Sequence, residues 1–435
     1  MLTAILIFAV VYLFIAFDIV DKTIAALIGA GLVIVFHVVP YEDALRSIDL
    51  NVIFLLTGMM AVVSILAETG LFEWLAIRIA TVTKGNGVYI TLLFLLLTAV
   101  LSAFLDNVTT VILMAPVTIL IAQILAIPAA PILICEAIFS NIGGTATLIG
   151  DPPNILIGSQ MSLSFGDFLV NLTPVITLIT LVLAFIVVAI LRHRLKASPE
   201  SRQRIRCARP AKAILQPVVL KRSMIVFAFI LCGFLFGRLL DIEPGIIALV
   251  GAVVMAQVCR IDVHKLFARV EWNTIFFFIG LFIMISALEH HGVFESMGQM
   301  ILRACGGNLM LTTFAILWFS AIASAIIDNI PLVMAMIPLV KGIIPVFAAS
   351  MGLQDAAAIH VQITEPLLWS LALGACLGGN GSIIGASANV VIAQIAARNK
   401  CPITFRRFAL YGAPIMVVSV AMCNLYLYLR YFVFL

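Results

Sequence analysis

Long apolar runs separated by short polar breaks make up most of this chain. Each run predicts a membrane-spanning helix, because about 20 apolar helical residues cross the hydrocarbon core of a bilayer. The runs show no strand-like alternation of apolar and polar residues, so helices are favoured over a β-barrel. The first half begins with three predicted spans, at residues 2–18, 23–39 and 51–67.

A short amphipathic stretch with Trp74, Arg78 and Lys84 follows the third span. Two apolar arms then flank Asp106-Asn107, and a further helix is predicted from about Pro131, before a last span at 173–191. The arms form either a re-entrant hairpin or two full spans, because about 17 helical residues reach about 26 Å.

The composition supports an integral membrane protein. The 435 residues are 63% hydrophobic and 11% charged, whereas soluble domains are about 45–50% apolar and about 25% charged. The first segment, Leu2 to Phe17, lacks a basic leading region and is followed by Asp18 and Asp21. We therefore expect a retained span and no cleaved signal peptide.

The halves of the chain resemble each other when shifted by 222 residues. Asp106-Asn107 then falls on Asp328-Asn329, and after an insertion near 351–364 the shift becomes 235, which brings Gly143-Gly144 onto Gly378-Gly379. Five or seven crossings per half are both odd numbers, which predicts an inverted repeat. The predicted architecture is an all-α membrane protein. Each repeat has three spans, a re-entrant hairpin, a discontinuous helix and a final span. The expected boundaries are 1–191 for the first repeat, 192–222 for a linker and 223–435 for the second repeat.

The linker is strongly basic. It holds ten of the 25 Lys and Arg residues and a single acid, Glu200. By the positive-inside rule it is expected in the cytoplasm, with both termini outside and the chain in the plasma (inner) membrane. Binding of a partner or of lipid headgroups by this linker is a second interpretation, and no nucleic-acid partner is expected.

One polar stretch, "SNIGGTATLIGDPPN" from Ser140 to Asn154, interrupts the apolar pattern. Non-helical backbone at membrane depth is tolerated where it lines a cavity, and inverted-repeat transporters bind their solutes at such broken helices. We therefore expect a solute site near the bilayer midplane. Its expected backbone lining comprises Gly143, Gly144, Gly150, Gly378, Gly379, Gly381 and Gly385. Its expected side-chain donors and acceptors comprise Asn107, Thr109, Thr145, Thr147, Asn154, Asn329, Asn380, Ser382 and Asn389.

Asp106 and Asp328 are the expected proton-coupling residues, because an ionisable group inside the bilayer is costly and indicates function. An N-cap for the following arm is the alternative for each. Asp151 and Glu136 are weaker candidates, the first as a possible turn residue and the second as a possible interfacial residue. Cys376 is a possible soft contact, although core packing is favoured for it.

The sequence gives no metal or cofactor signature. The eight cysteines are scattered singly without metal-ligand spacing, so no metal site is expected. The "GGNGSIIG" run lacks the preceding strand that a dinucleotide site requires. No Walker A motif is present, so ATP hydrolysis would need an associated ATPase subunit.

At "DNVTTVILMAPV", "SNIGGTATLIGDPPN" and their second-half partners, the chain resembles the ion transporter superfamily, most closely its arsenite permease and P-protein branch. The resemblance implies two re-entrant hairpins, two discontinuous helices, a transport domain that moves against a scaffold, and commonly a homodimer. Dicarboxylate carriers of the superfamily show Ser-Asn-Thr where this chain has Asp106-Asn107-Val108 and Asp328-Asn329-Ile330. Two carboxylates beside a dianion would repel it, which counts against dicarboxylates.

We therefore expect a secondary transporter and not an enzyme. The favoured activity is efflux of arsenite or antimonite, driven by inward proton flow. Sodium/proton antiport is the alternative, and a gated channel is a third class that would need no protonation cycle.

Overall fold

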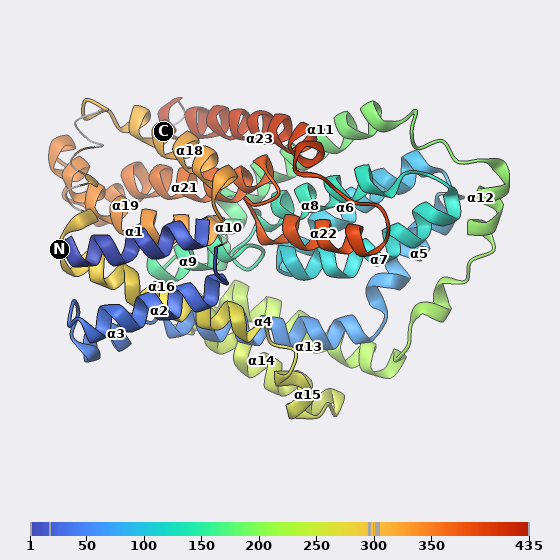
Figure 1. The fold of residues 1–435 in the computed structure, drawn as a ribbon, viewed down its shortest axis with the longest axis horizontal. Coiled ribbons are helices and arrows are strands. Elements are labelled where there is room, and N and C mark those ends of the chain that lie inside the picture. The colour runs from blue at the N-terminus through green and yellow to red at the C-terminus, as the bar shows by residue number, and fades with distance from the viewer. Residues whose placement is uncertain (1, 17–18, 295–296, 299, 301–304, 434–435) are drawn as a thin grey trace.

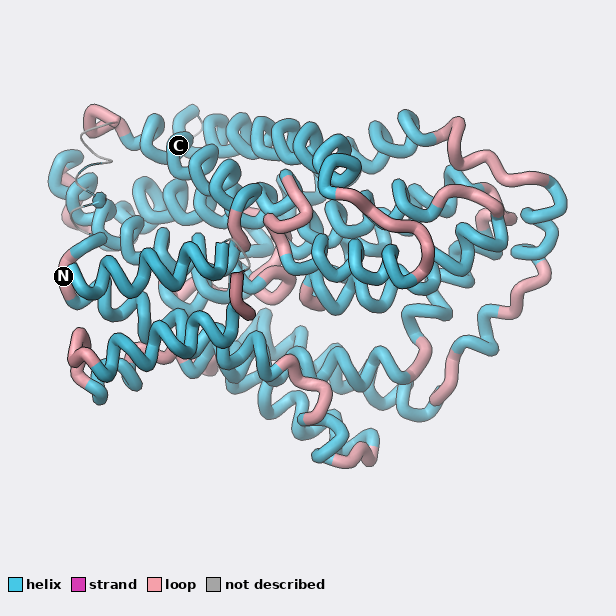
Figure 2. The backbone as a smooth tube through the Cα atoms, in the orientation of Figure 1, coloured by secondary structure: helices cyan, strands magenta, loops and turns pink. Residues whose placement is uncertain are grey.

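The protein was analysed as a computed structural model that describes residues 2–16, 19–294, 297–298, 300 and 305–433. Every regular element in this part of the chain is a helix (Figure 2). Ten of these helices are long and apolar enough to cross a membrane, and four apolar helices are shorter. The expectation of an all-α, multi-pass membrane protein is confirmed at this level.

The helices of the first half and the linker follow the apolar runs closely. They are α1 (Leu2–Ala16), α2 (Lys22–Val35), α3 (Tyr41–Arg46), α4 (Leu50–Glu68), α5 (Leu71–Val82), α6 (Gly87–Phe104), α7 (Asn107–Leu125), α8 (Ala129–Gly144), α9 (Pro152–Gln160), α10 (Phe165–Asn171), α11 (Thr173–Leu191), α12 (Pro199–Arg206) and η1 (Pro210–Ala213).

The helices of the second half continue the chain after the linker. They are α13 (Pro217–Phe236), η2 (Gly237–Leu240), α14 (Pro244–Cys259), α15 (Val263–Phe267), α16 (Trp272–His290), α18 (Leu309–Ile326), α19 (Asn329–Met351), α20 (Ala356–Ile359), η3 (His360–Thr364), α21 (Glu365–Gly378), η4 (Gly379–Gly381), α22 (Ser387–Arg398), α23 (Phe405–Tyr428) and η5 (Leu429–Val433).

Helix boundaries depart from the predictions where local geometry ends a helix. The span predicted to reach residue 39 ends at Val35, because His37 adopts a left-handed conformation with φ of 50°. The end predicted for the first span cannot be compared, since Phe17 and Asp18 lie outside the described residues. The insertion predicted near 351–364 contains the last residue of α19, the short helix α20 and η3.

The helices pack into two groups. In group I, α4 packs on α14, α2 on α16, and α1 and α13 cover these pairs; it consists of α1, α2, α4, α13, α14 and α16. In group II, α6 and α7 pack on α8, and α18 and α19 pack on α21; it consists of α6–α9, α11, α18, α19 and α21–α23. Figure 1 shows α4, α13 and α14 along one edge of the molecule, and α11 and α23 along the opposite edge.

Two glycines allow the closest crossings in group I. A Cβ on Gly58 of α4 would lie 2.4 Å from the carbonyl carbon of Ala248, and one on Gly280 of α16 would lie 2.7 Å from that of Ala26. Helix pairs in membranes favour small residues at such contacts because the backbones then approach closely. The two crossings place α4 on α14 and α16 on α2.

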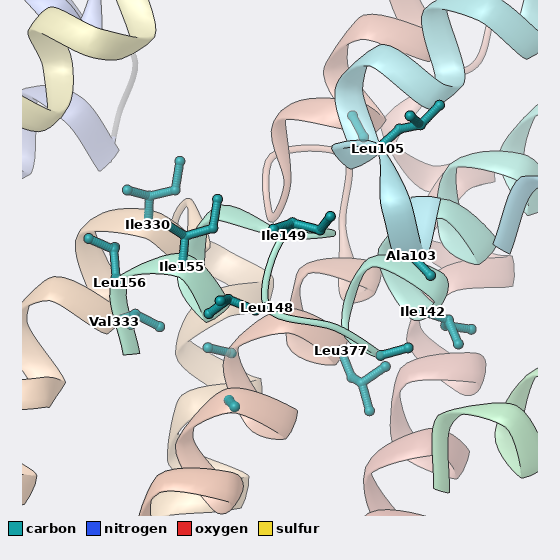
Figure 3. Packing of buried hydrophobic residues seen from close by; sticks show 14 of the residues in the cluster. Ala103, Leu105, Ile142, Leu148, Ile149, Ile155, Leu156, Ile330, Val333 and Leu377 are labelled. Carbon is teal, nitrogen blue, oxygen red and sulfur yellow. The ribbon is translucent and has the colours of Figure 1, made fainter. Parts of the chain in front are cut away.

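Apolar side chains surround the segment between α8 and α9 in group II (Figure 3). Leu148 and Ile149 lie on this segment and are buried, as are Ile155 at the start of α9 and Ile330 at the start of α19. The polar groups described below therefore lie inside an apolar shell, where water cannot easily replace a lost hydrogen bond.

Candidate functional site

Two helix breaks form the frame of the candidate site. Helix α8 ends at Gly144 and α9 begins at Pro152, whereas α21 ends at Gly378 and α22 begins at Ser387. The first segment is buried, the second is buried apart from Ile383 and the exposed Ile384, and glycine is needed where the segments cross. An added Cβ on Gly144 would lie 2.5 Å from the carbonyl oxygen of Gly150, and one on Gly379 would lie 2.8 Å from that of Gly385.

Each break is tied by one asparagine amide. Asn154 Nδ2 donates to the carbonyl oxygens of Thr145 (3.1 Å) and Thr147 (2.9 Å). Asn389 Nδ2 donates in the same way to Gly379 (2.8 Å) and Ser382 (2.9 Å). These amides satisfy the backbone that a broken helix leaves unpaired.

Three of the four expected hydroxyl groups bind backbone in this structure. Thr145 Oγ1 donates to the carbonyl of Asn141 at 2.7 Å, and Ser382 Oγ donates to that of Ala325 at 2.6 Å. Thr147 donates to the carbonyl of Ala103. Their donor hydrogens therefore hold the broken segments together here, because a buried carbonyl without a donor is costly.

A buried set of amides around one carboxylate lies between these breaks, and we call it the central polar cluster. It consists of Asn107, Asn141, Asp151, Asn329, Asn380 and Asn389, all of which are buried.

Asp151 receives one side-chain amide from the start of α7 and one from the start of α19. Asn107 Nδ2 of α7 lies 3.3 Å from Asp151 Oδ1, and Asn329 Nδ2 of α19 lies 3.4 Å from both Asp151 oxygens. Asp151 precedes α9, so three elements distant in sequence meet at one carboxylate. An ionised carboxylate only accepts hydrogen bonds, and these two amides supply donors to it.

Asn141 connects the two breaks. Its Nδ2 donates to Oδ1 of Asn380 and to Oδ1 of Asn389, each at 3.0 Å, and its Oδ1 accepts from Asn107 Nδ2 at 3.0 Å. Sequence reasoning did not single out Asn141. The matched position in the second half is Cys376, so comparison of the two halves does not indicate Asn141. The signal that could have found Asn141 is its position in the Gly-rich stretch.

Asp106 lies between α6 and α7, Asp328 lies between α18 and α19, and each caps the helix that follows. We call these two contacting helix pairs the first and the second hairpin, and the turns with the aspartates their tips. Asp106 Oδ1 accepts the N–H of Thr109 at 2.9 Å, and its other oxygen accepts the Thr109 hydroxyl. Asp328 Oδ1 accepts the N–H of Ile330 at 3.2 Å, and its Oδ2 pairs with Lys22 Nζ at 3.0 Å. The capping interpretation therefore describes part of the role of both carboxylates.

The weaker candidates fall in different places. Glu136 is completely buried on α8, and the Thr118 hydroxyl of α7 lies 2.5 Å from its Oε1. Cys376 Sγ lies 3.5 Å from Asn154 Oδ1, beside the break of the first half. Glu136 makes no described hydrogen bond to the central polar cluster, whereas Cys376 borders it.

The site carries no basic side chain among the described contacts. No Lys or Arg forms an ion pair or hydrogen bond with a member of the central polar cluster in the part of the chain that the structure describes. Within the same residues, no three His, Cys, Asp or Glu side chains converge as metal ligands would. The arrangement offers amide donors and acceptors, one buried carboxylate and a nearby thiol.

Comparisons with known proteins identify the family. The family model described as citrate transporter (CitMHS) matches residues 12–363. A "46 kDa membrane protein" of Mycobacterium leprae is 41% identical over 434 residues, which cover 99% of both chains. An uncharacterized transporter of Mycobacterium tuberculosis is 41% identical over 439 residues, again 99% of both. The human P protein is 33% identical over 509 aligned positions, covering 97% of this chain and 59% of that protein.

These matches support the P-protein relationship expected from the sequence. They do not show the expected relationship to arsenite permeases. The chain belongs to the citrate transporter (CitMHS) family of the ion transporter superfamily and is a secondary transporter, not an enzyme.

Proposed function

We propose that this transporter exports a small uncharged inorganic solute, arsenite or antimonite, in exchange for inward protons across the plasma membrane. The single observation that carries the proposal is the convergence of Asn107 and Asn329 on Asp151. A trihydroxy solute can exchange hydrogen bonds with these amides. Cys376 adds a soft sulfur atom beside the same group.

The family description names citrate, and the chemistry of this cluster argues against citrate here. Carboxylates of the substrate would approach Asp151, and like charges at short distance repel each other. Recognition of a polycarboxylate usually uses Arg or Lys, and none contacts the cluster in the described residues. We therefore keep the family assignment and propose a different solute class.

Sodium/proton antiport is the second candidate. The observation that favours it is the set of amide and carboxylate oxygens around one point, since hard cations prefer oxygen ligands. In both versions Asp151 and the tip carboxylates Asp106 and Asp328 alternate between a solute-bound, ionised state and a protonated state. One proton enters the cell as one carboxylate returns without solute.

The proposal includes the inverted repeat with boundaries at 191 and 222. Equivalent contacts support it: added Cβ atoms on Gly143 and Gly378 would lie 2.1 and 2.4 Å from the carbonyls of Ala99 and Ala321. Residues 99 and 321 differ by the 222-residue shift, and residues 143 and 378 differ by the 235-residue shift. Contacts preserved at both shifts are expected of two copies of one fold.

The proposal also includes an elevator-like movement of group II against group I. The division into two packed groups supports it, because the hairpins and both broken helices belong to group II. A homodimer formed by group I and an associated ATPase subunit are further expectations that stay proposals.

Counterflow in proteoliposomes tests the solute. Vesicles preloaded with arsenite, antimonite, sodium or citrate are diluted into trace labelled solute, and accumulation by arsenite or antimonite alone is expected. Accumulation with sodium alone would favour the antiporter, and accumulation with citrate would contradict the proposal.

The variant Asp151→Asn tests the coupling. It keeps size and hydrogen bonding but cannot titrate. We expect it to lose arsenite accumulation driven by an imposed pH gradient in everted vesicles, while it still equilibrates arsenite. Glu136→Gln is the matched control, because Glu136 is equally buried and lies apart from the cluster. If Asp151→Asn still concentrates the solute, the coupling belongs to Asp106 or Asp328 instead.

A further inference from the structure

Lys22, at the first position of α2, forms an ion pair with the second hairpin. Its Nζ lies 3.0 Å from Asp328 Oδ2 and 3.1 Å from Ser387 Oγ. Ser387 Oγ is itself 3.2 Å from Asp328 Oδ2. Lys22 belongs to group I, whereas Asp328 and Ser387 belong to group II, so this triad connects the two groups.

The lysine is held firmly on the group I side. Asp21 caps α2 by accepting the N–H groups of Thr23 and Ile24, and the Thr23 hydroxyl donates to the carbonyl of Asn273 at 3.0 Å. The ammonium lies 5.3 Å from the ring centre of Phe277 on α16, a distance typical of cation–π contact. The start of α2 thus presents a fixed positive charge to the tip of the second hairpin.

The Asp328 carboxylate is largely shielded from solvent. Its side chain is 14% exposed, and that of Lys22 is 37% exposed. A partly buried carboxylate gains more from a counter-ion than an exposed one, because removal of the partner leaves a poorly solvated charge.

Among the described residues, no ion pair equivalent to this one is formed by Asp106 of the first hairpin. At the 222-residue shift Lys22 corresponds to Pro244, and at the 235-residue shift Ser387 corresponds to Pro152. Asp106 instead uses Thr109 of its own helix, and the position matched to Thr109 is Pro331. The two tips therefore share their aspartates and differ in every side-chain partner of those aspartates.

We propose that Lys22 is a positioning residue that neutralises Asp328 and fixes the tip of the second hairpin to group I in this conformation. This inference rests on the proposed movement of group II against group I, during which the pair must separate. Asp328, unlike Asp106, then loses a cationic partner during that movement. The ammonium faces Asp328 in one state only, which makes the hairpins inequivalent in the transport cycle.

The other charged groups near the triad are acidic or neutral. Asp21 and Glu271 face Lys22, while Tyr12 of α1 and Asp151 face Asp328. Lys22 is the basic side chain that the described contacts place near these groups. No neighbouring cation among them therefore compensates for its loss.

The test compares Lys22→Met with Lys22→Arg in the full-length protein. Hydrogen–deuterium exchange in detergent without added solute follows the tip peptides 320–335 and 98–113. We expect Lys22→Met to raise exchange at the second tip at least severalfold and leave the first tip unchanged, and Lys22→Arg to restore the second. In everted vesicles, the pH dependence of uptake should change in Lys22→Met and stay as in the wild type in Lys22→Arg, because only methionine removes the positive charge beside Asp328. In an Asp328→Asn background, Lys22→Met should add no further shift.

Arg238→Met is the control, because the exposed Arg238 of η2, which follows α13 of group I, pairs at 3.0 Å with Asp167 of α10, which precedes α11 of group II. It should change neither the exchange at the tips nor the pH profile. Unchanged exchange at the second tip in Lys22→Met would overturn the proposal, as would equal increases at both tips. Absence of arsenite transport in the wild-type protein would contradict the proposed solute alone, since the exchange measurement needs no solute.

Discussion

At the scale of single residues, side-chain amides make most of the contacts in the candidate site. Asn107 and Asn329 donate to one carboxylate from two separate helices, while Asn141 links them to the second break. An amide can donate and accept at once, so it can exchange a neighbour for a solute without leaving a buried charge. This property suits a site that must bind and release.

The variants Asn107→Ala and Asn329→Ala should each weaken solute binding. Each removes a buried amide and leaves Asp151 without one donor, which costs about 1–3 kcal/mol, or roughly ten- to a hundred-fold in Kd. Equilibrium binding to purified protein measures this. Asn399→Ala is the control, because Asn399 is exposed and bonds only within its own helix. Normal affinity in both tip variants would mean that these amides are structural only.

At the scale of elements, glycine determines how closely each hairpin approaches its broken helix. Helix α8 meets α6 at Gly143, and α21 meets α18 at Gly378, with added Cβ atoms only 2.1 and 2.4 Å from opposing carbonyl oxygens. Backbone atoms cannot move aside as a flexible side chain can. The position of each tip relative to its break therefore depends on these two glycines.

Gly143→Ala and Gly378→Ala should each lower the thermal stability of the detergent-solubilised protein. Overpacking of this kind costs about 1–3 kcal/mol. Gly31→Ala on α2 is the matched control, because no heavy atom lies within 4 Å of its added Cβ; alanine in a helix there should stabilise by about 0.5–1 kcal/mol. Melting followed by tryptophan fluorescence distinguishes the two outcomes, and equal melting temperatures for all three variants would refute the close-packing argument.

At the scale of the whole molecule, charge determines orientation. The basic linker contains α12, which lies at one end of the long axis in Figure 1. The loop around Asp241, between α13 and α14, is separated from the linker by the full length of α13. If the linker is cytoplasmic, the exposed Asp241 must face outside.

Cysteine labelling measures this orientation. In a background without the exposed Cys207 and Cys232, a cysteine in Ser201→Cys should react with membrane-impermeant maleimide only in everted vesicles. One in Asp241→Cys should react only in intact cells. The reverse pattern would invert the topology and with it the direction of the proposed proton flow.

The sequence by itself determined the helices and the local breaks. Apolar runs predicted α4 and α11 to within a residue, and the "SNIGG" and "DPPN" residues predicted the end of α8 and the start of α9. These features depend on neighbouring residues in the chain, because apolar periodicity and the helix-breaking effect of Gly and Pro act over a few residues. The aspartates at both tips were recognisable for the same reason.

Only the tertiary structure decided which polar groups meet. Asp151 and Asn329 are 178 residues apart, and Lys22 and Asp328 are 306 apart. No sequence periodicity connects such distant positions. Comparison of the two halves did not indicate these contacts either, because Asp151 matches Ala386 and Lys22 matches Pro244. Glu136 shows the same limit, since its place near the start of a helix gave no sign that packing by α7 buries it completely. Burial and long-range pairing are set by how helices pack on one another, and that packing depends on all of their faces at once.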